Sequence, residues 1–298
     1  MNYLITGATG FLGKKLVSHL LERGDSVNYL ARKRSRQLDP RAAYHCWNPP
    51  EKPPMNSVPR HDVIVHLMGE PIMQRWTDQA KKRIRSSRVD NTRQLVSAIA
   101  ELKYKPRVLV SASAVGYYGN RGDEILTERS SPGNGFLAEL CRDWEREALY
   151  ACELGLRVVT VRIAPVLGRE GGALAEMLKP FRLGLGGKFG SGRQWMPWIH
   201  IEDLIRLFLF AAQNDTVSGA VNGSSPNPVT NTVFTRTLAK VLSRPAFFTV
   251  PGFALKLALG ELADFLLDSL RVIPPAAEQA GFSFEHPELA GALGSMLS

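Results

Sequence analysis

A short glycine-rich stretch near the amino terminus constrains the fold of this chain more than any other feature. It lies between a predicted buried strand, residues 3–6, and a predicted amphipathic helix, residues 11–23. Gly7, Gly10 and Gly13 follow one another at the corner between the two. A buried strand that turns directly into a helix is typical of α/β folds, so the pattern predicts a parallel sheet with helices packed on it.

Each glycine of this turn has its own expected role. Gly7 permits the tight turn, Gly10 leaves room for a pyrophosphate, and Gly13 lets the helix pack close to the strand. The free N–H groups of the helix's first turn, together with the helix dipole, favour phosphate groups. The alternative is a strand–turn–helix corner without a ligand, but the position of the glycines favours dinucleotide binding.

The end of the second predicted strand, residues 26–31, indicates which dinucleotide binds. NAD-binding folds place a carboxylate there, which holds the ribose 2′-hydroxyl. This chain has Arg32 and Lys33 instead. Because these cations suit a 2′-phosphate, we expect NADP rather than NAD, the alternative being a solvated basic loop.

The rest of the chain continues the alternation of strands and helices. Further strands are predicted at residues 44–47, 62–67, 107–110 and 157–163, with a last short one at 221–222, and long helices at 79–102 and 136–151. This predicts a Rossmann-type, doubly wound parallel sheet with a smaller, mainly helical C-terminal substrate lobe. We place the cofactor domain at residues 1–225, with 166–198 contributing to the lobe, and the C-terminal domain at residues 226–298.

Composition limits the other classes of function. No apolar run is long enough to span a bilayer, so we expect no membrane association. Three cysteines without metal-ligand spacing suggest reduced thiols in a cytoplasmic protein and no metal site. The net charge of +9 suits anionic nucleotides as well as nucleic acid. Because no nucleic-acid-binding module is recognisable, we do not expect the protein to bind nucleic acid.

Several motifs together resemble the extended short-chain dehydrogenase/reductases, the NAD(P)-dependent epimerases and dehydratases. They are the glycine turn at 6–13, the segment 111–119, Arg162 with Gly168, and the segment 198–204. The segments 136–145, 180–187 and 197–200, with the C-terminal residues 251–297, resemble more narrowly the subgroup called epimerase family proteins, which ends in a small conserved domain. The resemblance covers essentially the whole chain.

The resemblance implies a cofactor site spread over four strand ends. Its residues would be Gly7, Thr9, Gly10, Phe11, Leu12, Arg32, Lys33, Leu67, Met68, Arg88 and Ser111. Relatives of this type are expected to bind NADP, in agreement with the charge argument. A small molecule is the expected substrate, and a homodimer is left open.

The catalytic pattern of that family is incomplete in this chain. Active members use a Ser or Thr and a Tyr-x-x-x-Lys, in which the lysine lowers the pKa of the tyrosine. Ser113 fits the first position, but Phe136 and Leu140 replace the tyrosine and the lysine. Tyr117 and Tyr118 are the nearby phenols, and each is either a substitute acid or a packed aromatic.

Three functions therefore stay open from the sequence. The first is an NADP-dependent oxidoreductase or epimerase with a rearranged acid, and the second is a non-catalytic NADP-binding or sensor protein. A nucleic-acid-associated protein is a distant third. The substrate is not readable, although Arg162, Lys188 and Arg193 are candidates to meet an anion.

Overall fold

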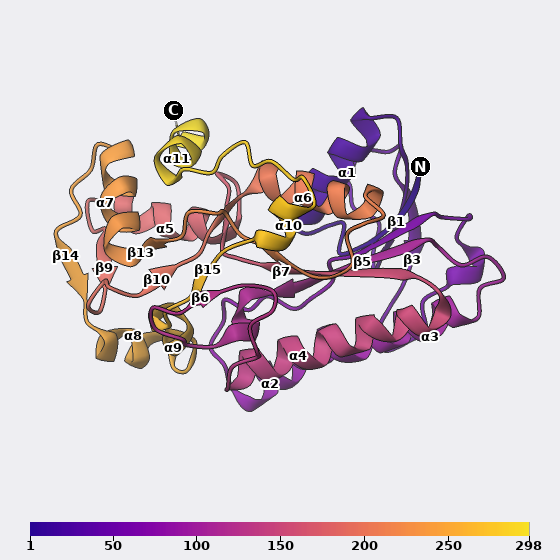
Figure 1. The fold of residues 1–298 in the computed structure, drawn as a ribbon, viewed down its shortest axis with the longest axis horizontal. Coiled ribbons are helices and arrows are strands. Elements are labelled where there is room, and N and C mark those ends of the chain that lie inside the picture. The colour runs from indigo at the N-terminus through magenta and orange to yellow at the C-terminus, as the bar shows by residue number, and fades with distance from the viewer. Residues whose placement is uncertain (298) are drawn as a thin grey trace.

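A seven-stranded parallel sheet forms the centre of the computed structural model, which describes residues 1–297 (Figure 1). The strand order is β3-β2-β1-β4-β5-β7-β12. The strands are β1 (Asn2–Thr6), β2 (Ser26–Ala31), β3 (Ala43–Cys46), β4 (Val63–His66), β5 (Val108–Ala114), β7 (Arg157–Ile163) and β12 (Gly219–Gly223). The order reverses between β1 and β4, which is where open α/β sheets bind ligands beyond the carboxyl ends of their strands.

Helices cover both faces of this sheet (Figure 1). One layer contains α1 (Phe11–Glu22) and α6 (Ile201–Gln213), and the other contains α2 (Asp78–Arg85), α3 (Asn91–Ala100) and α4 (Phe136–Leu149). The strands alternate their apolar side chains between the layers: Tyr3 belongs to the core under α1, and Leu4 to the core under α3. Such two-sided burial is expected of a parallel sheet.

A smaller lobe follows the carboxyl ends of the strands. Its helices are α5 (Gly172–Arg182), α7 (Asn231–Val241), α8 (Gly252–Leu259), α9 (Leu262–Leu267) and α11 (Leu289–Leu297). Helix α10 (Pro275–Gln279) packs instead on β12 at the edge of the main sheet. Short strands pair between distant segments: β6 (Ile125–Leu126) with β15 (Arg271–Val272), β8 (Val166–Leu167) with β11 (Ile199–His200), β9 (Gly187–Phe189) with β14 (Phe248–Val250), and β10 (Trp195–Met196) with β13 (Val229–Thr230). Leu174, Trp198, Phe234 and Leu293 belong to a separate core there.

The fold class predicted from the sequence is confirmed, with three local corrections. The strand expected to end at residue 110 continues to Ala114, because its last four residues pair with β7. The long helix expected at 79–102 contains a π-helical turn, Ser86–Asp90, between α2 and α3. The strand at 221–222 is not the last one, since β13, β14 and β15 follow it.

None of the helices within residues 1–297 combines the length and the apolar character that a transmembrane span requires.

Candidate cofactor and substrate site

Two glycines of the N-terminal turn are required by close backbone packing. Gly7 has a φ of +74°, and a Cβ there would lie 2.7 Å from the carbonyl carbon of Leu67, which follows β4. A Cβ at Gly13 would lie 2.3 Å from the carbonyl oxygen of Gly7. These distances are far shorter than van der Waals contact, so the turn is held against both its own helix and the next strand.

The third glycine faces open space. Around a Cβ placed on Gly10, and apart from its own flanking residues, the carbonyl oxygen of Gly7 at 3.3 Å is the one atom within 4 Å in the described part of the chain. Gly10 is the N-cap of α1, and neither a capping side chain nor an acidic residue in the first turn occupies the free N–H groups. Room, N–H donors and the positive end of a helix dipole therefore meet at one point, which fits a pyrophosphate.

The predicted basic cluster lies at the end of β2. Arg32, Lys33 and Arg34 are exposed, and no hydrogen bond or ion pair of their side chains is found within residues 1–297. The nearby carboxylate of Asp39 is already engaged by Arg41, 2.7 Å away. Uncompensated cations at this strand end fit the additional phosphate that distinguishes NADP from NAD.

Arg88 lies under the segment that follows β4. Its Nη1 donates to the carbonyl oxygen of Glu70 at 2.9 Å, and its guanidinium carbon lies 5.2 Å from the ring centre of Trp144. A Cβ on Gly69 would be 2.8 Å from that carbon. Burial lowers the pKa of Arg88 to about 10, which leaves it charged at neutral pH. The segment beyond Leu67 and Met68 is thus held down by a buried cation.

His66 is a core residue rather than a catalyst. Its Nδ1 lies 2.6 Å from the hydroxyl of Thr6 and its Nε2 lies 2.9 Å from that of Thr92. The Thr92 hydroxyl donates its proton to the carbonyl oxygen of Arg88, so it must accept from Nε2, and Nδ1 accepts from Thr6. Complete burial lowers the pKa of His66 to about 4, so the imidazole is neutral.

Ser111 and Ser113 are both buried in β5. Ser111 pairs in register with His66, and its hydroxyl donates to the carbonyl oxygen of Ala112 at 3.3 Å. Ser113 donates to Oε1 of Glu145 in α4 at 2.6 Å. Sequence reasoning did not indicate Glu145 as a partner, because the contact joins two elements far apart in the chain.

Glu145 also anchors Arg162, at the centre of a buried polar network. Nε and Nη2 of Arg162 donate to the two carboxylate oxygens of Glu145, each at 2.8 Å. Nη1 donates to the Tyr118 hydroxyl at 3.0 Å, which in turn donates to Asn222 at 2.6 Å. Arg162 is therefore consumed by internal contacts and is not free to bind an anion.

Tyr117 and Tyr118 differ sharply in their surroundings. Tyr118 is fully buried, and burial raises its pKa to about 12. Tyr117 is half-buried, its hydroxyl has no hydrogen bond within residues 1–297, and the Arg162 guanidinium carbon lies 3.5 Å from its ring centre. Of the two phenols, Tyr117 is the one with an uncommitted hydroxyl.

The positions of the missing tyrosine and lysine are both apolar in structure as well as in sequence. Phe136 packs edge-on against Trp76, with ring centres 5.3 Å apart. Leu140, one turn later in α4, is buried in the main core. Phe136 forms part of the wall of the cleft described next, whereas Leu140 anchors α4 to the core.

A cleft of about 280 Å³ separates this part of α4 from α9 of the C-terminal lobe. Trp76, Gly119, Asn134 and Phe136 line one side, and Asp264, Phe265 and Asp268 line the other. A smaller cavity of about 60 Å³, bounded by Phe265, Asp268 and Trp195, adjoins it. Asp268 was not among the predicted site residues, because only tertiary packing brings the lobe to the cleft. Lys188 donates to the carbonyl oxygen of Ser191 at 3.4 Å, Arg193 is exposed, and both lie outside the lining of these cavities.

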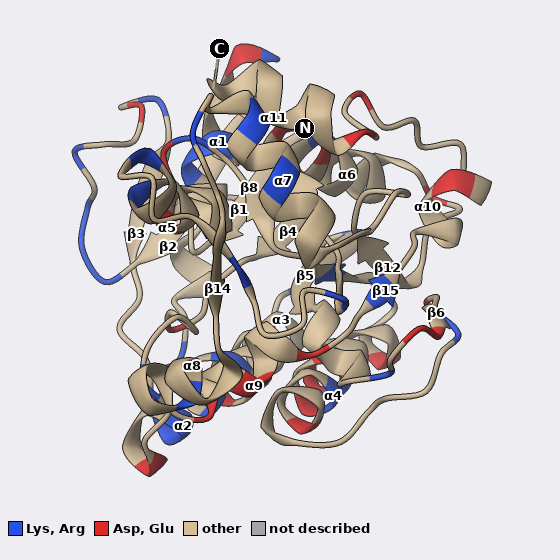
Figure 2. Cartoon of the chain, turned by 90° about the vertical axis from the view of Figure 1, so that its left-hand side faces the viewer, with Lys and Arg blue, Asp and Glu red and all other residues tan. Residues whose placement is uncertain are grey.

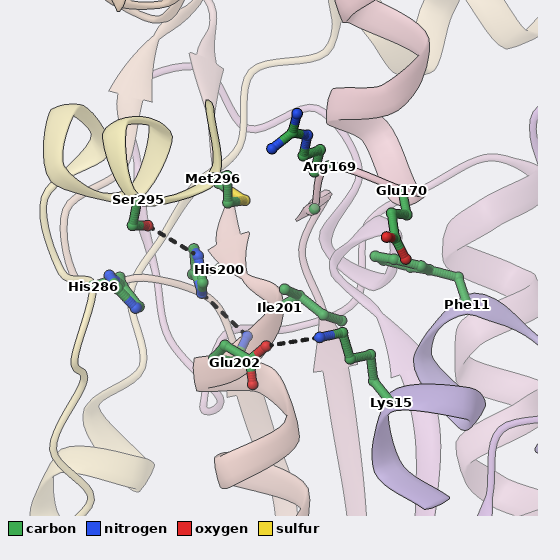
Figure 3. Close-up of a pocket in the computed structure, with 11 residues that line it drawn as sticks. Phe11, Lys15, Arg169, Glu170, His200, Ile201, Glu202, His286, Ser295 and Met296 are labelled. Atoms are coloured by element: carbon green, nitrogen blue, oxygen red, sulfur yellow. Dashed lines mark hydrogen bonds and ion pairs between the residues drawn. The ribbon is translucent and has the colours of Figure 1, made fainter. Parts of the chain in front are cut away.

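Behind the cofactor turn lies another cavity, of about 320 Å³ (Figure 3). Figure 3 shows Lys15 reaching Glu202, while Ser295 and Met296 of α11 line the cavity from the opposite side to Phe11. The ring of Phe11 fills the space where side chains of Gly168 and Gly171 would lie, since a Cβ on either would come within 2.4 Å of it. The cofactor turn and the start of the lobe are in direct contact here.

Comparison with known proteins decides the family. The model of the NAD dependent epimerase/dehydratase family matches residues 3–222, and that of a domain of unknown function, DUF1731, matches residues 250–296. The chain belongs to the epimerase/dehydratase family. Within it, the chain is 40% identical over its whole length, and over 87% of the relative's, to the epimerase family protein SDR39U1 homolog, chloroplastic, of Arabidopsis thaliana. It is 37% identical to the epimerase family protein YfhF of Bacillus subtilis, with 100% of this chain and 98% of the relative covered.

Two solved structures superpose on this chain. The human epimerase family protein SDR39U1, crystallised with NADPH, superposes with a TM-score of 0.90 at 34% identity, with 100% of this chain and 99% of that chain covered. MoeE5 in complex with UDP-glucuronic acid and NAD superposes with a TM-score of 0.76 at 20% identity, covering 100% of this chain and 98% of that chain. The second similarity concerns the fold alone.

Proposed function

We propose that this protein is an NADP-dependent oxidoreductase or epimerase of the extended short-chain dehydrogenase/reductase type, acting on a small molecule. The observation that carries the proposal is the unpaired cluster of Arg32, Lys33 and Arg34 at the end of β2, beside a glycine turn that leaves room for a pyrophosphate. The NADPH in the crystal structure of human SDR39U1 supports the same choice of cofactor. When bound, such a cofactor supplies hydride exchange.

The proposed roles of this chain's residues follow from their places. Gly10 and the first-turn N–H groups of Phe11 and Leu12 would hold the pyrophosphate, and Arg32 and Lys33 the 2′-phosphate. The further cofactor contacts that we propose follow β1 and β4, or lie in the π-helical turn between α2 and α3 and within β5. They are Gly7, Thr9, Leu67, Met68, Arg88 and Ser111.

For proton exchange we propose Tyr117, whose ring contacts Tyr118 and Arg162. Ser113 would support this arrangement through Glu145, which accepts from both Ser113 and Arg162. The guanidinium of Arg162 lies over the ring of Tyr117 and is paired with the carboxylate of Glu145. Ser113 and Tyr118 each give their proton to an internal acceptor. Without the lysine of the usual pair, proton transfer should be slow and should accelerate at alkaline pH in the direction that needs the phenolate.

The second candidate is a non-catalytic NADP-binding or sensor protein. The apolar side chains of Phe136 and Leu140 favour it, because neither can exchange a proton. On a verified substrate, Tyr117→Phe should lower kcat by at least about tenfold if the first proposal holds. Wild-type turnover by Tyr117→Phe would remove Tyr117 from this role. Tight NADPH binding without turnover in a broad carbonyl and alcohol screen would favour the sensor.

The cofactor preference provides the direct test. We expect NADPH to bind more tightly than NADH, and Arg32→Asp to weaken NADPH binding by about ten- to a hundredfold, because a charge-assisted hydrogen bond contributes about 1.5–3 kcal/mol. Arg36→Asp, an equal charge change on the same loop, should have a small effect. Equal dissociation constants of the wild-type protein for NADPH and NADH in a fluorescence titration would refute the proposal.

We further propose that the cofactor domain covers residues 1–225 and the C-terminal domain residues 226–298, with residues 166–198 contributing to the lobe. Free thiols at Cys46, Cys141 and Cys152 support a reducing compartment, and we propose the cytoplasm.

A further inference from the structure

The cleft between α4 and α9 has largely apolar and aromatic walls. Phe136 and Leu137 contribute from α4, Trp76 from the segment before α2, and Phe265 and Leu270 from the lobe. Asn120 and Asn134 add neutral amide groups. Walls of this kind bind a molecule with an apolar or aromatic portion and a few polar groups.

The charged groups that line this cleft are carboxylates. They belong to Glu261, Asp264 and Asp268, and among the described residues neither a lysine nor an arginine lines this cleft or the smaller cavity beside it. The ammonium of Lys81 lies 5.5 Å from the Phe136 ring centre but is paired with Glu261. Arg162 is held by Glu145 within the core.

Asp268 differs from the other two carboxylates. Glu261 is paired with Lys81, and Asp264 with Lys256 at 2.7 Å. The carboxylate of Asp268 has no hydrogen bond or ion pair within residues 1–297, although the residue is half-buried and borders both cavities. Burial and the nearby Asp264 raise its pKa to about 6. A partly desolvated carboxylate without a partner is unfavourable until a donor reaches it.

We propose that this cleft binds a neutral or cationic substrate with an apolar or aromatic portion, and that Asp268 recognises its ammonium or hydroxyl group. The inference rests on the proposed function, which makes this cleft the substrate site. A nucleotide diphosphate sugar does not suit it, because the diphosphate would lie near three carboxylates, and among the described residues neither a lysine nor an arginine lines the cleft to offset its charge. On this reading, the C-terminal domain supplies the residue that determines specificity.

Three probes that share one ring test the proposal: 2-phenylethylammonium, 2-phenylethanol and phenylacetate, with UDP-glucose as a fourth. Each is titrated by NMR into NADPH-saturated protein at about pH 7.5, where the carboxylate of Asp268 is ionised. We expect the ammonium probe to bind at least about tenfold more tightly than phenylacetate, and the alcohol to fall between them. UDP-glucose should bind no more tightly than phenylacetate.

Two variants assign the effect to one carboxylate. Asp268→Asn should reduce the preference for the ammonium probe to less than about threefold, whereas Asp264→Asn, whose carboxylate is already paired, should retain it. The inference is overturned if phenylacetate or UDP-glucose binds as tightly as the ammonium, if the ammonium does not bind, or if Asp268→Asn keeps the preference. NADPH binding by the same samples is measured separately, and a failure to bind NADPH would refute the proposed function instead.

Discussion

Three glycines of one motif perform three different tasks at the level of single residues. Gly7 and Gly13 are fixed by backbone atoms closer than 3 Å to where a Cβ would lie, so a side chain there disrupts the fold itself. Gly10 has extended φ and ψ angles that other residues adopt readily, and the space beside it is open. Of these three glycines, only Gly10 can therefore be substituted to block ligand binding without disrupting the fold.

Gly10→Val tests this separation. The valine side chain would occupy the place of the pyrophosphate, and we expect NADPH affinity to fall by at least about a hundredfold, or about 3 kcal/mol. The thermal midpoint should stay close to that of wild type in the absence of cofactor. Gly291→Ala, at a helical glycine where a Cβ would meet no described residue from outside the helix within 4 Å, is the matched control and should bind NADPH normally. Unchanged affinity in a folded Gly10→Val variant would show that the turn is only structural.

His66 gives the molecule a defined response to acid. Its pKa is about 4 in the folded state and about 6.5 when unfolded. Between pH 4 and pH 6.5, the imidazole is therefore protonated in the unfolded chain but neutral in the folded protein. The unfolding free energy should therefore fall as the pH is lowered from about 6.5 to about 4, by up to about 3 kcal/mol from this residue.

Urea unfolding of the wild type and of His66→Gln over this pH range measures that contribution. The variant lacks the titrating group, so its unfolding free energy should depend less steeply on pH. His200, whose pKa burial also lowers to about 4, is present in both proteins and cancels in the comparison. Identical slopes for the two proteins would contradict the assignment.

Helix α4 shows, at the level of elements, why the missing catalytic pair is not restored by two substitutions. Phe136 borders a cleft and has room for a hydroxyl, whereas Leu140 is enclosed by the core. A lysine there would have to bury its ammonium without a partner. The helix has thus adapted to the absence of the pair.

Phe136→Tyr and Leu140→Lys should differ accordingly. We expect Phe136→Tyr to change the unfolding free energy by less than about 1 kcal/mol, and Leu140→Lys to lower it by about 3 kcal/mol or more. Leu140→Met, of similar volume, is the control for Leu140→Lys and should cost less than about 1.5 kcal/mol. Chemical denaturation of the purified proteins provides the measurement, and equal stability of all three would mean that the environment of Leu140 is more open than the structure indicates.

The elements also show how far a sequence can be read. The strands β2 and β7 were predicted residue for residue, because each is rich in β-branched, aliphatic or aromatic residues and follows a glycine-containing turn. The end of β5 was missed because Ser111–Ala114 has no apolar pattern of its own and is a strand only by pairing with β7. The two- and three-residue strands of the lobe form between segments distant in the chain, so local pattern predicts none of them.

The residues of the candidate site could be predicted from the sequence to a similar extent. The glycine turn and the basic end of β2 follow from local sequence, and the structure places both at the carboxyl ends of neighbouring strands. The partners of Ser113 in β5 and Arg162 in β7 were not predicted, because Glu145 contacts both from helix α4. Asp268 was not predicted, because its proposed role depends on the cavities that it borders in the folded protein and not on a local sequence motif.

At the scale of the whole molecule, the C-terminal segment connects the cofactor domain to the lobe. It runs over α6 of the cofactor domain before it forms α11. The buried carboxylate of Asp203, in the first turn of α6, accepts hydrogen bonds from the backbone N–H groups of Glu285 and His286 at 2.8 and 2.9 Å. Figures 1 and 2 both show α11 beside α7 of the lobe, where this segment finishes. One carboxylate therefore holds both the entry to α11 and the start of α6.

Asp203→Asn tests this connection. The amide turns one acceptor into a donor that faces a backbone N–H, and we expect a loss of about 1–3 kcal/mol in unfolding free energy. Hydrogen exchange should accelerate first over the segment from Glu285 to Leu297. Glu202→Gln, a half-exposed neighbour on the same turn, should leave exchange there unchanged. Uniform acceleration across the sheet would indicate instead that Asp203 supports the whole fold rather than this segment.

The contact of Phe11 with Gly168 and Gly171 has a consequence for exchanging parts between relatives. The ring belongs to the cofactor turn, while the two glycines begin the lobe, and they fit only as a matched set. A lobe grafted from a relative with a side chain at either glycine position would collide with the turn of its new host, and a smaller residue at position 11 would leave a void beneath an otherwise suitable graft. Chimeras of this family should therefore inherit the turn and the lobe entrance from the same parent.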